Sequence, residues 1–324
     1  MSLGDPCGIG PELAAKAWTS LRDQTGFAFC VIGDAALMEA QGVPVARVTD
    51  VAETTSVFST ALPVLDIPLT VAVVTGEPDS VHAPQIVAWI SKGVELCLER
   101  RARALVTCPI AKSVLYATGF KFPGHTEYLA DLCRAGNVVP TPVMMLTAKD
   151  LRVVLATIHT PLSAVPMALS REGLVELAQI TQKALVRDFA IPAPRLVMAG
   201  LNPHAGEDGT IGREEIDIIT PAIFYLQNES VNIKGPYPAD TLFHDEARLT
   251  YDAVLCMYHD QGLIPLKTLD FWGGVNITLG LPIVRTSPDH GTGFNIAGKG
   301  IARADSLLAA IRTADEISRN RAKS

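Results

Sequence analysis

Short apolar runs alternate with segments of helical periodicity along most of this chain, and this alternation strongly limits the folds it can adopt. Residues 84–101 carry an apolar side chain at every fourth position from Ile86 to Leu98, which predicts an amphipathic helix. The apolar runs expected to form strands are residues 27–32, 104–108, 143–146, 152–156, 196–201 and 253–258. Strands that alternate with helices predict an α/β fold with a largely parallel sheet.

Local signals add detail to this pattern. Lys149-Asp150 separates two of the expected strands and is interpreted as a connecting turn. Ser170 precedes an apolar-periodic segment and is expected to cap a helix, and residues 301–312 predict a late helix.

Composition limits the class of protein. With 324 residues, the chain is expected to form about two domains. The formal charge of −7 argues against a nucleic-acid partner, which would require a basic surface. No apolar run approaches the length needed to span a bilayer, and no signal peptide is seen, so we expect a cytoplasmic protein without membrane contact. The six cysteines form no CxxC pair and are interpreted as reduced, buried thiols.

Three histidines follow apolar strands. His159, His204 and His259 come directly after, or within a few residues of, the runs at 152–156, 196–201 and 253–258. Ligands of open α/β sheets bind beyond the carboxyl ends of the strands, and three imidazoles there would suit one divalent metal with an open position. The alternative is that each histidine is an ordinary loop residue. His82 and His244 lie in polar, loop-like stretches and are interpreted as surface residues.

A second group lies further along the chain. Lys267, Asn276 and Arg285 are spaced by nine residues and lie among apolar neighbours. Two cations and an amide suit a phosphate or a carboxylate, because arginine offers a fork of donors and lysine a point charge. A solvated face is the alternative, and the apolar surroundings make it the less favoured of the two.

Three glycine-containing segments complete the pattern. Residues 124–127 place His125 and Thr126 in a turn that suits an oxyanion or simply caps a helix. Residues 4–12 open a helix with Pro11 near its first position. Residues 289–300 form a glycine-rich loop that would let a backbone approach a nucleotide. Neither a GxGxxG fingerprint nor a Walker-type GK[ST] is present, so a Rossmann-type nucleotide site is not expected.

Together these segments resemble the 4-hydroxythreonine-4-phosphate dehydrogenase family. The matching stretches are residues 4–12, 123–127, 201–207, 238–243, 257–262, 275–285 and 289–292. They occur in order over essentially the whole chain and are jointly very specific. The loop 290–300 also resembles the adenosine-binding loop of isopropylmalate and isocitrate dehydrogenases.

The resemblance implies a two-domain fold like that of isocitrate and isopropylmalate dehydrogenases, with the active site in the interdomain cleft. The expected domains are residues 1–115 plus 272–324 for NAD binding, and 116–271 for metal and substrate binding and dimerisation. It further implies a homodimer with the active site at the subunit interface, so that the three histidines need not come from one chain.

The resemblance also implies residue roles. Asp240 would lie near the polar end of the substrate, and Asp240 and Lys267 are candidates for proton transfer, with the general base left open. The implied metal ligands are His159, His204 and His259. The implied substrate ligands are His125, Thr126, Lys267, Asn276 and Arg285. The implied cofactor-binding residues are His290, Gly291, Thr292 and Asn295.

The implied activity is NAD- or NADP-linked, metal-dependent oxidation of 4-phosphooxy-L-threonine, a small phosphorylated hydroxy amino acid, in vitamin B6 biosynthesis. The product, 2-amino-3-oxo-4-phosphooxybutanoate, would lose carbon dioxide to give 3-amino-2-oxopropyl phosphate. Zinc is the expected metal, with magnesium, cobalt, nickel or manganese as alternatives. Related activities on threonate or erythronate 4-phosphate or a terephthalate dihydrodiol stay open, as do a zinc hydrolase and a non-catalytic binder.

Two departures from the family pattern are visible. Only Met1-Ser2-Leu3 precedes the Gly-Asp-Pro motif, where family members usually carry a first strand. Cys7 replaces a usual alanine. Neither position touches the expected metal ligands.

Overall fold

The chain divides into two units, and the central part of the sequence forms most of the second unit. The computed structural model describes residues 1–117, 119–122 and 124–323. Unit 1 comprises Met1–Pro142 and Leu281–Ser318, and unit 2 comprises Val143–Gly280 and the residues from Arg319 on. The boundaries predicted from sequence, near residues 115 and 271, lie before these divisions. The difference arises because β5 (Val143–Ala148) pairs with β10 (Val275–Leu279), which places both strands in unit 2.

Unit 1 contains two groups of parallel strands. In the first, β1 and β2 both pair with β3, and in the second β4 pairs with β11. Ser2 bridges to Ile32 and to Thr107, so the N-terminal segment joins the two groups. The elements of unit 1 are α1 (Gly10–Leu21), β1 (Val31–Gly33), α2 (Ala35–Glu39), β2 (Val45–Val48), η1 (Val51–Glu53), α3 (Thr54–Val57), β3 (Leu62–Asp66), η2 (Ser80–His82), α4 (Ala83–Leu98), β4 (Leu105–Val106), α5 (Lys112–Tyr116), α6 (His125–Leu132), β11 (Arg285–Pro288), η7 (Phe294–Ile296) and α12 (Asp305–Arg321), whose last turn belongs to unit 2.

The first expected strand is shorter than predicted. Residues 27–32 were expected to be extended, and β1 covers only Val31–Gly33. Backbone pairing begins at Cys30, whose carbonyl accepts a hydrogen bond of 2.6 Å from the Met1 ammonium. Residues 27–30 line a cavity of about 750 Å³ within unit 1. None of the predicted site residues lines this cavity.

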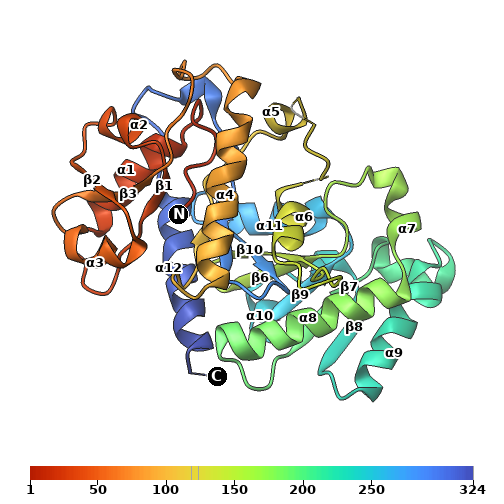
Figure 1. Ribbon diagram of the computed structural model, residues 1–324. Helices are drawn as coiled ribbons and strands as arrows, with labels where there is room; N and C mark the ends of the chain where they lie inside the picture. Colours follow the sequence, from red (N-terminus) through yellow and green to blue (C-terminus); the bar gives the residue numbers. More distant parts are fainter. Residues whose placement is uncertain (118, 123, 324) are drawn as a thin grey trace. The chain divides into compact units, whose positions relative to one another are not determined.

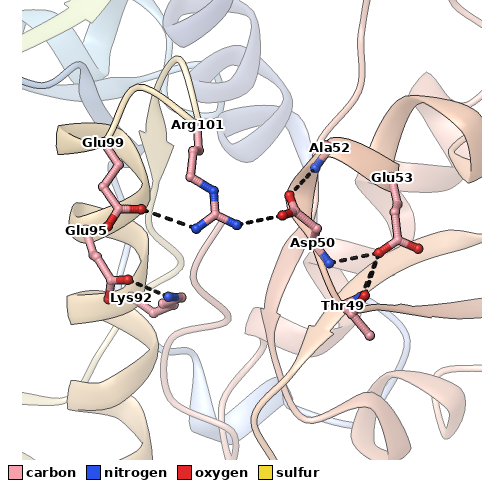
Figure 2. A network of polar contacts seen from close by, with 8 residues as sticks. All are labelled: Thr49, Asp50, Ala52, Glu53, Lys92, Glu95, Glu99 and Arg101. Atoms are coloured by element: carbon pink, nitrogen blue, oxygen red, sulfur yellow. Dashed lines mark hydrogen bonds and ion pairs between the residues drawn. The ribbon is translucent and has the colours of Figure 1, made fainter.

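A polar network ties the end of β2 to the end of α4 (Figure 2). The Asp50 carboxylate accepts from the Ala52 amide at 2.9 Å, and Glu53 accepts from the Asp50 amide at 2.8 Å, which forms a capping box. Arg101 donates to both Asp50 (2.9 Å) and Glu99 (3.2 Å). These groups are solvent-exposed, so we expect the ion pairs to contribute little to stability.

Unit 2 is built on one mixed sheet with the strand order β10-β5-β6-β9-β7-β8. β5 pairs antiparallel with β10 and β6, whereas the pairs β6–β9, β9–β7 and β7–β8 are parallel. The remaining elements of unit 2 are β6 (Leu151–Leu155), η3 (Leu162–Ala164), α7 (Val165–Ala168), α8 (Arg171–Phe189), β7 (Leu196–Ala199), η4 (Pro203–Gly209), the π-helix η5 (Glu215–Ile219), α9 (Thr220–Asn228), β8 (Ile233–Tyr237), η6 (Ala239–Thr241), α10 (Asp245–Arg248), β9 (Ala253–Cys256) and α11 (His259–Leu269). The α/β class with a mostly parallel sheet, predicted from sequence, is confirmed.

Helices pack on this sheet through apolar contacts. α8 and α9 lie beside one another (Figure 1); α8 contacts β5 and β10, α9 contacts β8, and α11 contacts β5, β6 and β9. The core of unit 2 includes Val153, Leu155, Val254, Cys256 and Leu266, which are all buried. No helix in the described part of the chain is long and apolar enough to cross a membrane.

Several local predictions are confirmed. The helix expected at 84–101 is α4, and Lys149 makes the β5–β6 turn with a φ of 52°. Ser170 caps α8 by accepting a hydrogen bond from the Gly173 amide at 3.1 Å. All six cysteines are free thiols, five of them buried and Cys97 partly buried.

The late helix starts later than expected. The sequence predicted residues 301–312, and α12 begins at Asp305. The preceding segment makes contacts with α1 instead: the Lys16 ammonium donates to the carbonyls of Gly300 (2.9 Å) and Ala302 (2.7 Å), and the Ala302 amide donates to Glu12 at 2.9 Å.

Gly262 lets α11 pack closely against the sheet. A Cβ atom at this position would lie 3.0 Å from Leu155 Cδ2, 3.3 Å from Val153 Cβ and 3.4 Å from Cys256 Sγ. We predict that Gly262→Val lowers the free energy of unfolding by about 1–3 kcal/mol, the usual cost of overpacking a core. Urea unfolding would measure it, with Thr268→Ala on the exposed side of α11 as the control. Equal stability of the two variants would show that this contact is not tight.

Candidate functional site

The three strands that precede the histidines are immediate neighbours in unit 2. β6 pairs with β9 at Leu155↔Cys256, and β9 pairs with β7 at Met198↔Leu255. The ladder continues past the strands, because the Thr157 amide donates to the Met257 carbonyl at 3.2 Å. All three strands run parallel, so their carboxyl ends meet at one edge of the sheet.

Two of the three histidines lie together at this edge. The ring centroids of His159 and His259 are 6.1 Å apart. His259 is the first residue of α11, and its Nδ1 lies 2.7 Å from the Asp260 carboxylate. A carboxylate on one ring nitrogen orients an imidazole and leaves the other nitrogen to a ligand. Within the described ranges, no three His, Cys, Asp or Glu side chains are grouped closely enough to hold a metal ion.

His204 lies on an unusual turn after β7. Residues 204–208 all have left-handed backbone angles, with φ between 42° and 83°. Gly206 adopts such angles freely, whereas the other four residues each add roughly 1 kcal/mol of strain or more. Strain of this kind persists only where surrounding contacts enforce it. The turn presents His204 as an exposed side chain.

Gln261 links two of the histidine-bearing segments, although the sequence did not suggest a role for it. Its Oε1 accepts from the Met257 amide and its Nε2 donates to the Gly200 carbonyl, both at 2.7 Å. The side chain is buried, so these bonds are protected from water. The ends of β9 and β7 are therefore fixed to one another. This role of Gln261 is visible only from its contact with Gly200, which is distant in sequence.

The other predicted residues of unit 2 occupy separate positions. Asp240 is exposed in η6, which contacts the His204-bearing segment η4. The Lys267 ammonium lies 5.3 Å from the Phe271 ring centroid, in cation–π contact. Asn276 lies in β10, and its buried Oδ1 makes no hydrogen bond within the described structure. A buried amide oxygen of this kind is a candidate acceptor for a ligand donor.

Unit 1 brings Arg285 and His125 together. The Arg285 guanidinium is buried at the start of β11, where it donates to the Thr107 hydroxyl at 2.8 Å and lies 3.3 Å from His125 Nδ1. Thr126 is also buried in the first turn of α6. His125 Nε2 is buried without a hydrogen bond to any described residue. The grouping of Arg285 with His125 and Thr126 was predicted only through family resemblance.

Burial sets the protonation of this group. It holds the pKa of His125 well below the ordinary value, and the nearby charges of Arg285 and Lys112 act in the same direction. Burial also lowers the pKa of Arg285 to about 10, so its guanidinium stays charged at neutral pH. A neutral imidazole beside a buried cation is suited to binding an anion.

Lys112 belongs to this cationic group, and the sequence analysis missed it. Its ammonium lies 3.6 Å from the position that a Cβ atom of residue 124 would occupy. Glu127 Oε2 lies even closer to that position, at 2.6 Å, so a side chain at residue 124 would displace the Glu127 carboxylate. The available signal was the short distance in sequence between Lys112 and the expected strand at 104–108.

The glycine-rich loop is held by α1 and the segment before it. The Ile9 amide donates to the Thr292 carbonyl at 2.9 Å, and a Cβ atom at Gly8 would lie 2.7 Å from that carbonyl. Glu12 accepts from the Ala302 amide at 2.9 Å. His290 Nδ1 lies 3.0 Å from the Gly291 carbonyl, and its Nε2 is buried without a hydrogen bond to the described residues. The loop thus keeps a fixed shape around an unsatisfied imidazole nitrogen.

These features define a two-unit α/β protein with histidines at the carboxyl edge of one sheet and a buried cationic group in the other unit. Residues 27–314 match the family described as pyridoxal phosphate biosynthetic protein PdxA. The chain belongs to this family.

Named relatives agree with the assignment. A 4-hydroxythreonine-4-phosphate dehydrogenase from Caulobacter vibrioides is 59% identical over 99% of this chain and 97% of its own length. One from Zymomonas mobilis is 51% identical, covering 99% and 96% of the two chains. The crystal structure of 4-hydroxythreonine-4-phosphate dehydrogenase from Klebsiella pneumoniae matches with a TM-score of 0.87 and 36% identity, covering 98% and 96%.

The lowered pKa of His125 predicts a pH-dependent stability. Because the folded pKa lies below the unfolded value of about 6.5, the unfolded state binds more protons as the pH falls below about 7. Wild-type protein should therefore lose more stability than His125→Asn between about pH 7.5 and pH 5.5. Urea unfolding at both pH values measures this, with the exposed His244→Asn as control. Parallel pH profiles for His125→Asn and wild type would contradict it.

Proposed function

We propose that this chain catalyses the NAD- or NADP-linked, divalent-metal-dependent oxidation of 4-phosphooxy-L-threonine at its secondary hydroxyl. The product is 2-amino-3-oxo-4-phosphooxybutanoate, a β-keto acid that loses carbon dioxide to give 3-amino-2-oxopropyl phosphate. The reaction belongs to vitamin B6 biosynthesis, in the cytoplasm. The observation that carries the proposal is the adjacency of the three parallel strands β6, β9 and β7, each followed by a histidine.

The metal ligands in this proposal are His159, His204 and His259. An imidazole bound to zinc places its ring centroid about 3.2 Å from the metal, so two such centroids lie about 5.2 Å apart at a tetrahedral angle. The centroids of His159 and His259 are 6.1 Å apart, so the two rings would move about 1 Å toward one another to share a tetrahedral metal. When bound, a divalent metal supplies Lewis-acid polarisation of the substrate hydroxyl.

A homodimer completes the site in this proposal. Among the residues described in one chain, no set of three side chains can hold a metal, although the three strands lie side by side. In the proposed homodimer, the three histidines around one metal come from both subunits, so that one subunit supplies the ligand that the other lacks. The resemblance to the 4-hydroxythreonine-4-phosphate dehydrogenase family points to the same arrangement.

The glycine-rich loop is the proposed cofactor site, with His290, Gly291, Thr292 and Asn295 as its binding residues. Two observations support it. Gly291 has open space where a side chain would extend, and His290 carries a buried nitrogen that makes no hydrogen bond within the described chain. A nicotinamide dinucleotide bound there supplies the hydride acceptor.

The substrate phosphate is the proposed ligand of the cationic group in unit 1. Arg285 supplies donors in a fixed fork, and Lys112 supplies a point charge. His125 and Thr126 complete the donor set. Lys267 and Asn276 are further proposed substrate ligands, and Asp240 and Lys267 are proposed to move protons during oxidation.

The first test is NADH formation from 4-phosphooxy-L-threonine with and without a chelator. Chelator-sensitive turnover that added Zn²⁺, Co²⁺ or Mg²⁺ restores is the expected result. Absence of NADH with every metal would contradict the proposal. Threonate and erythronate 4-phosphates and the dihydrodiol, tested in parallel, would then identify a related dehydrogenase. Failure of NAD to raise the melting temperature would instead favour a metal-dependent hydrolase.

A second prediction concerns the phosphate. Arg285→Lys keeps the charge but loses the fork of donors, so KM for the phosphorylated substrate should rise roughly 10- to 100-fold, the value of one or two charge-assisted hydrogen bonds. Inhibition by inorganic phosphate should weaken in parallel. Arg103→Lys is the matched control, because Arg103 forms an exposed ion pair with Asp315 in the same unit. An unchanged KM in Arg285→Lys would remove Arg285 from the phosphate site.

A further inference from the structure

Glu215 is a buried carboxylate that contacts residues before and after His204. It is 3% exposed and is the first residue of the π-helix η5. Its Oε1 accepts hydrogen bonds from the backbone amides of Leu201 and Asn202, both at 2.8 Å. Its Oε2 accepts from the Asn202 side-chain amide at 2.9 Å. Three hydrogen bonds therefore join this carboxylate to Leu201 and Asn202, the second of which lies two residues before His204.

The same carboxylate borders the turn on its far side. A Cβ atom at Gly206 would lie 2.6 Å from Glu215 Oε2, and one at Gly200 would lie 3.0 Å from Oε1. Gly212 packs in the same way against Asn202, whose Nδ2 would lie 2.2 Å from a Cβ atom at position 212. Glycines at these three positions allow the backbone to close around Glu215 and Asn202.

This packing accounts for the left-handed turn. His204 lies midway between Asn202, which Glu215 binds, and Gly206, which touches Glu215. Glu214 adds a hydrogen bond of 2.7 Å from the Asn202 side chain. These contacts hold the chain at Asn202, two residues before His204, and at Gly206, two residues after it. His204 is the first of the five left-handed residues.

We propose that Glu215 is a positioning residue for His204: it holds the left-handed turn so that the imidazole keeps the direction a metal ligand needs. The inference rests on the proposed function, in which His204 binds the metal. Groups behind a metal ligand commonly change metal affinity 10- to 100-fold when they are altered. Glu215 differs from the usual case because it orients the ligand through the backbone and not through the ring.

The test is Zn²⁺ affinity of the full-length protein, measured by competition with a chromophoric chelator. Glu215→Gln places an amide where the Asn202 side chain donates, so one hydrogen bond becomes a donor–donor contact. We expect its Zn²⁺ affinity to fall roughly 10- to 100-fold. Asp217→Asn, an exposed carboxylate on the same π-helix, should stay within about twofold of wild type. Wild-type affinity in folded Glu215→Gln would overturn the inference.

A second pair of variants separates positioning from loss of stability. Leu226→Ala removes a fully buried side chain from α9 and should lower the melting temperature without changing Zn²⁺ affinity. An affinity loss in Leu226→Ala equal to that in Glu215→Gln would contradict the inference. The absorption spectrum of the Co²⁺ form should shift in Glu215→Gln and not in Leu226→Ala, because the ligand geometry changes only in the former.

If Glu215→Gln does not fold, Gly206→Ala provides the same test from the other side. Its methyl group would displace Glu215 Oε2 and strain a residue with a φ of 83°, so Zn²⁺ affinity should fall in the same range. Unchanged affinity there would overturn the inference. His204→Ala separates the two hypotheses. Wild-type affinity in His204→Ala would refute the proposed metal site, whereas lost affinity there with full affinity in Glu215→Gln would refute only the role of Glu215.

Discussion

The parallel backbone ladder of β6, β9 and β7 is the constraint on which the rest of unit 2 depends. Hydrogen bonds between neighbouring strands fix their register, and the register determines which residues leave the sheet at the same edge. His159 and His259 come together because their strands pair in phase past Leu155 and Cys256. The apolar core around these strands keeps the ladder dry and so keeps the edge rigid.

Buried polar side chains then fix the positions of the strand ends and of the turns that follow them. Gln261 ties the end of β9 to the end of β7, and Glu215 holds the turn that follows β7. In unit 1, burial keeps His125 neutral beside the Arg285 cation. Gln261 and Glu215 make these hydrogen bonds to residues distant in sequence, and each lies close to a histidine with a proposed role in metal binding.

The sequence predicted what depends on local pattern. Apolar runs identified the histidine-bearing strands, Ser170 identified the start of α8, and Lys149 identified the β5–β6 turn. Periodicity carries no information on which strands pair, so it did not predict that β5 and β10 would place the unit boundaries at 142/143 and 280/281. Nor did it predict that the residues before α12 would bind Lys16 of α1.

For the candidate site, too, the sequence indicated residues by type and spacing and did not indicate those whose role depends on tertiary contacts. Residue type and position led us to predict a metal site at His159, His204 and His259, and the spacing of Lys267, Asn276 and Arg285 led us to predict an anion site; both stay predictions. Lys112, Gln261 and Glu215 were not predicted, because their significance lies in what they touch. The left-handed angles of residues 204–208 were also unpredictable, since His, Ala, Glu and Asp do not usually adopt them in series.

The chain segments that connect the histidine-bearing strands can vary in length more than the strands themselves. Between β6 and β7 the chain forms α7 and α8, and between β7 and β9 it forms α9, β8 and α10. None of these elements sets the register of β6, β9 and β7, which is fixed by direct strand pairing. Surface loops within these connections tolerate insertion and deletion without disturbing the ends of the three strands, provided that the His204 turn and Glu215 are kept. Homologues can therefore differ in chain length and in outer surface, and so acquire new partners, while the chemistry at the strand ends stays the same.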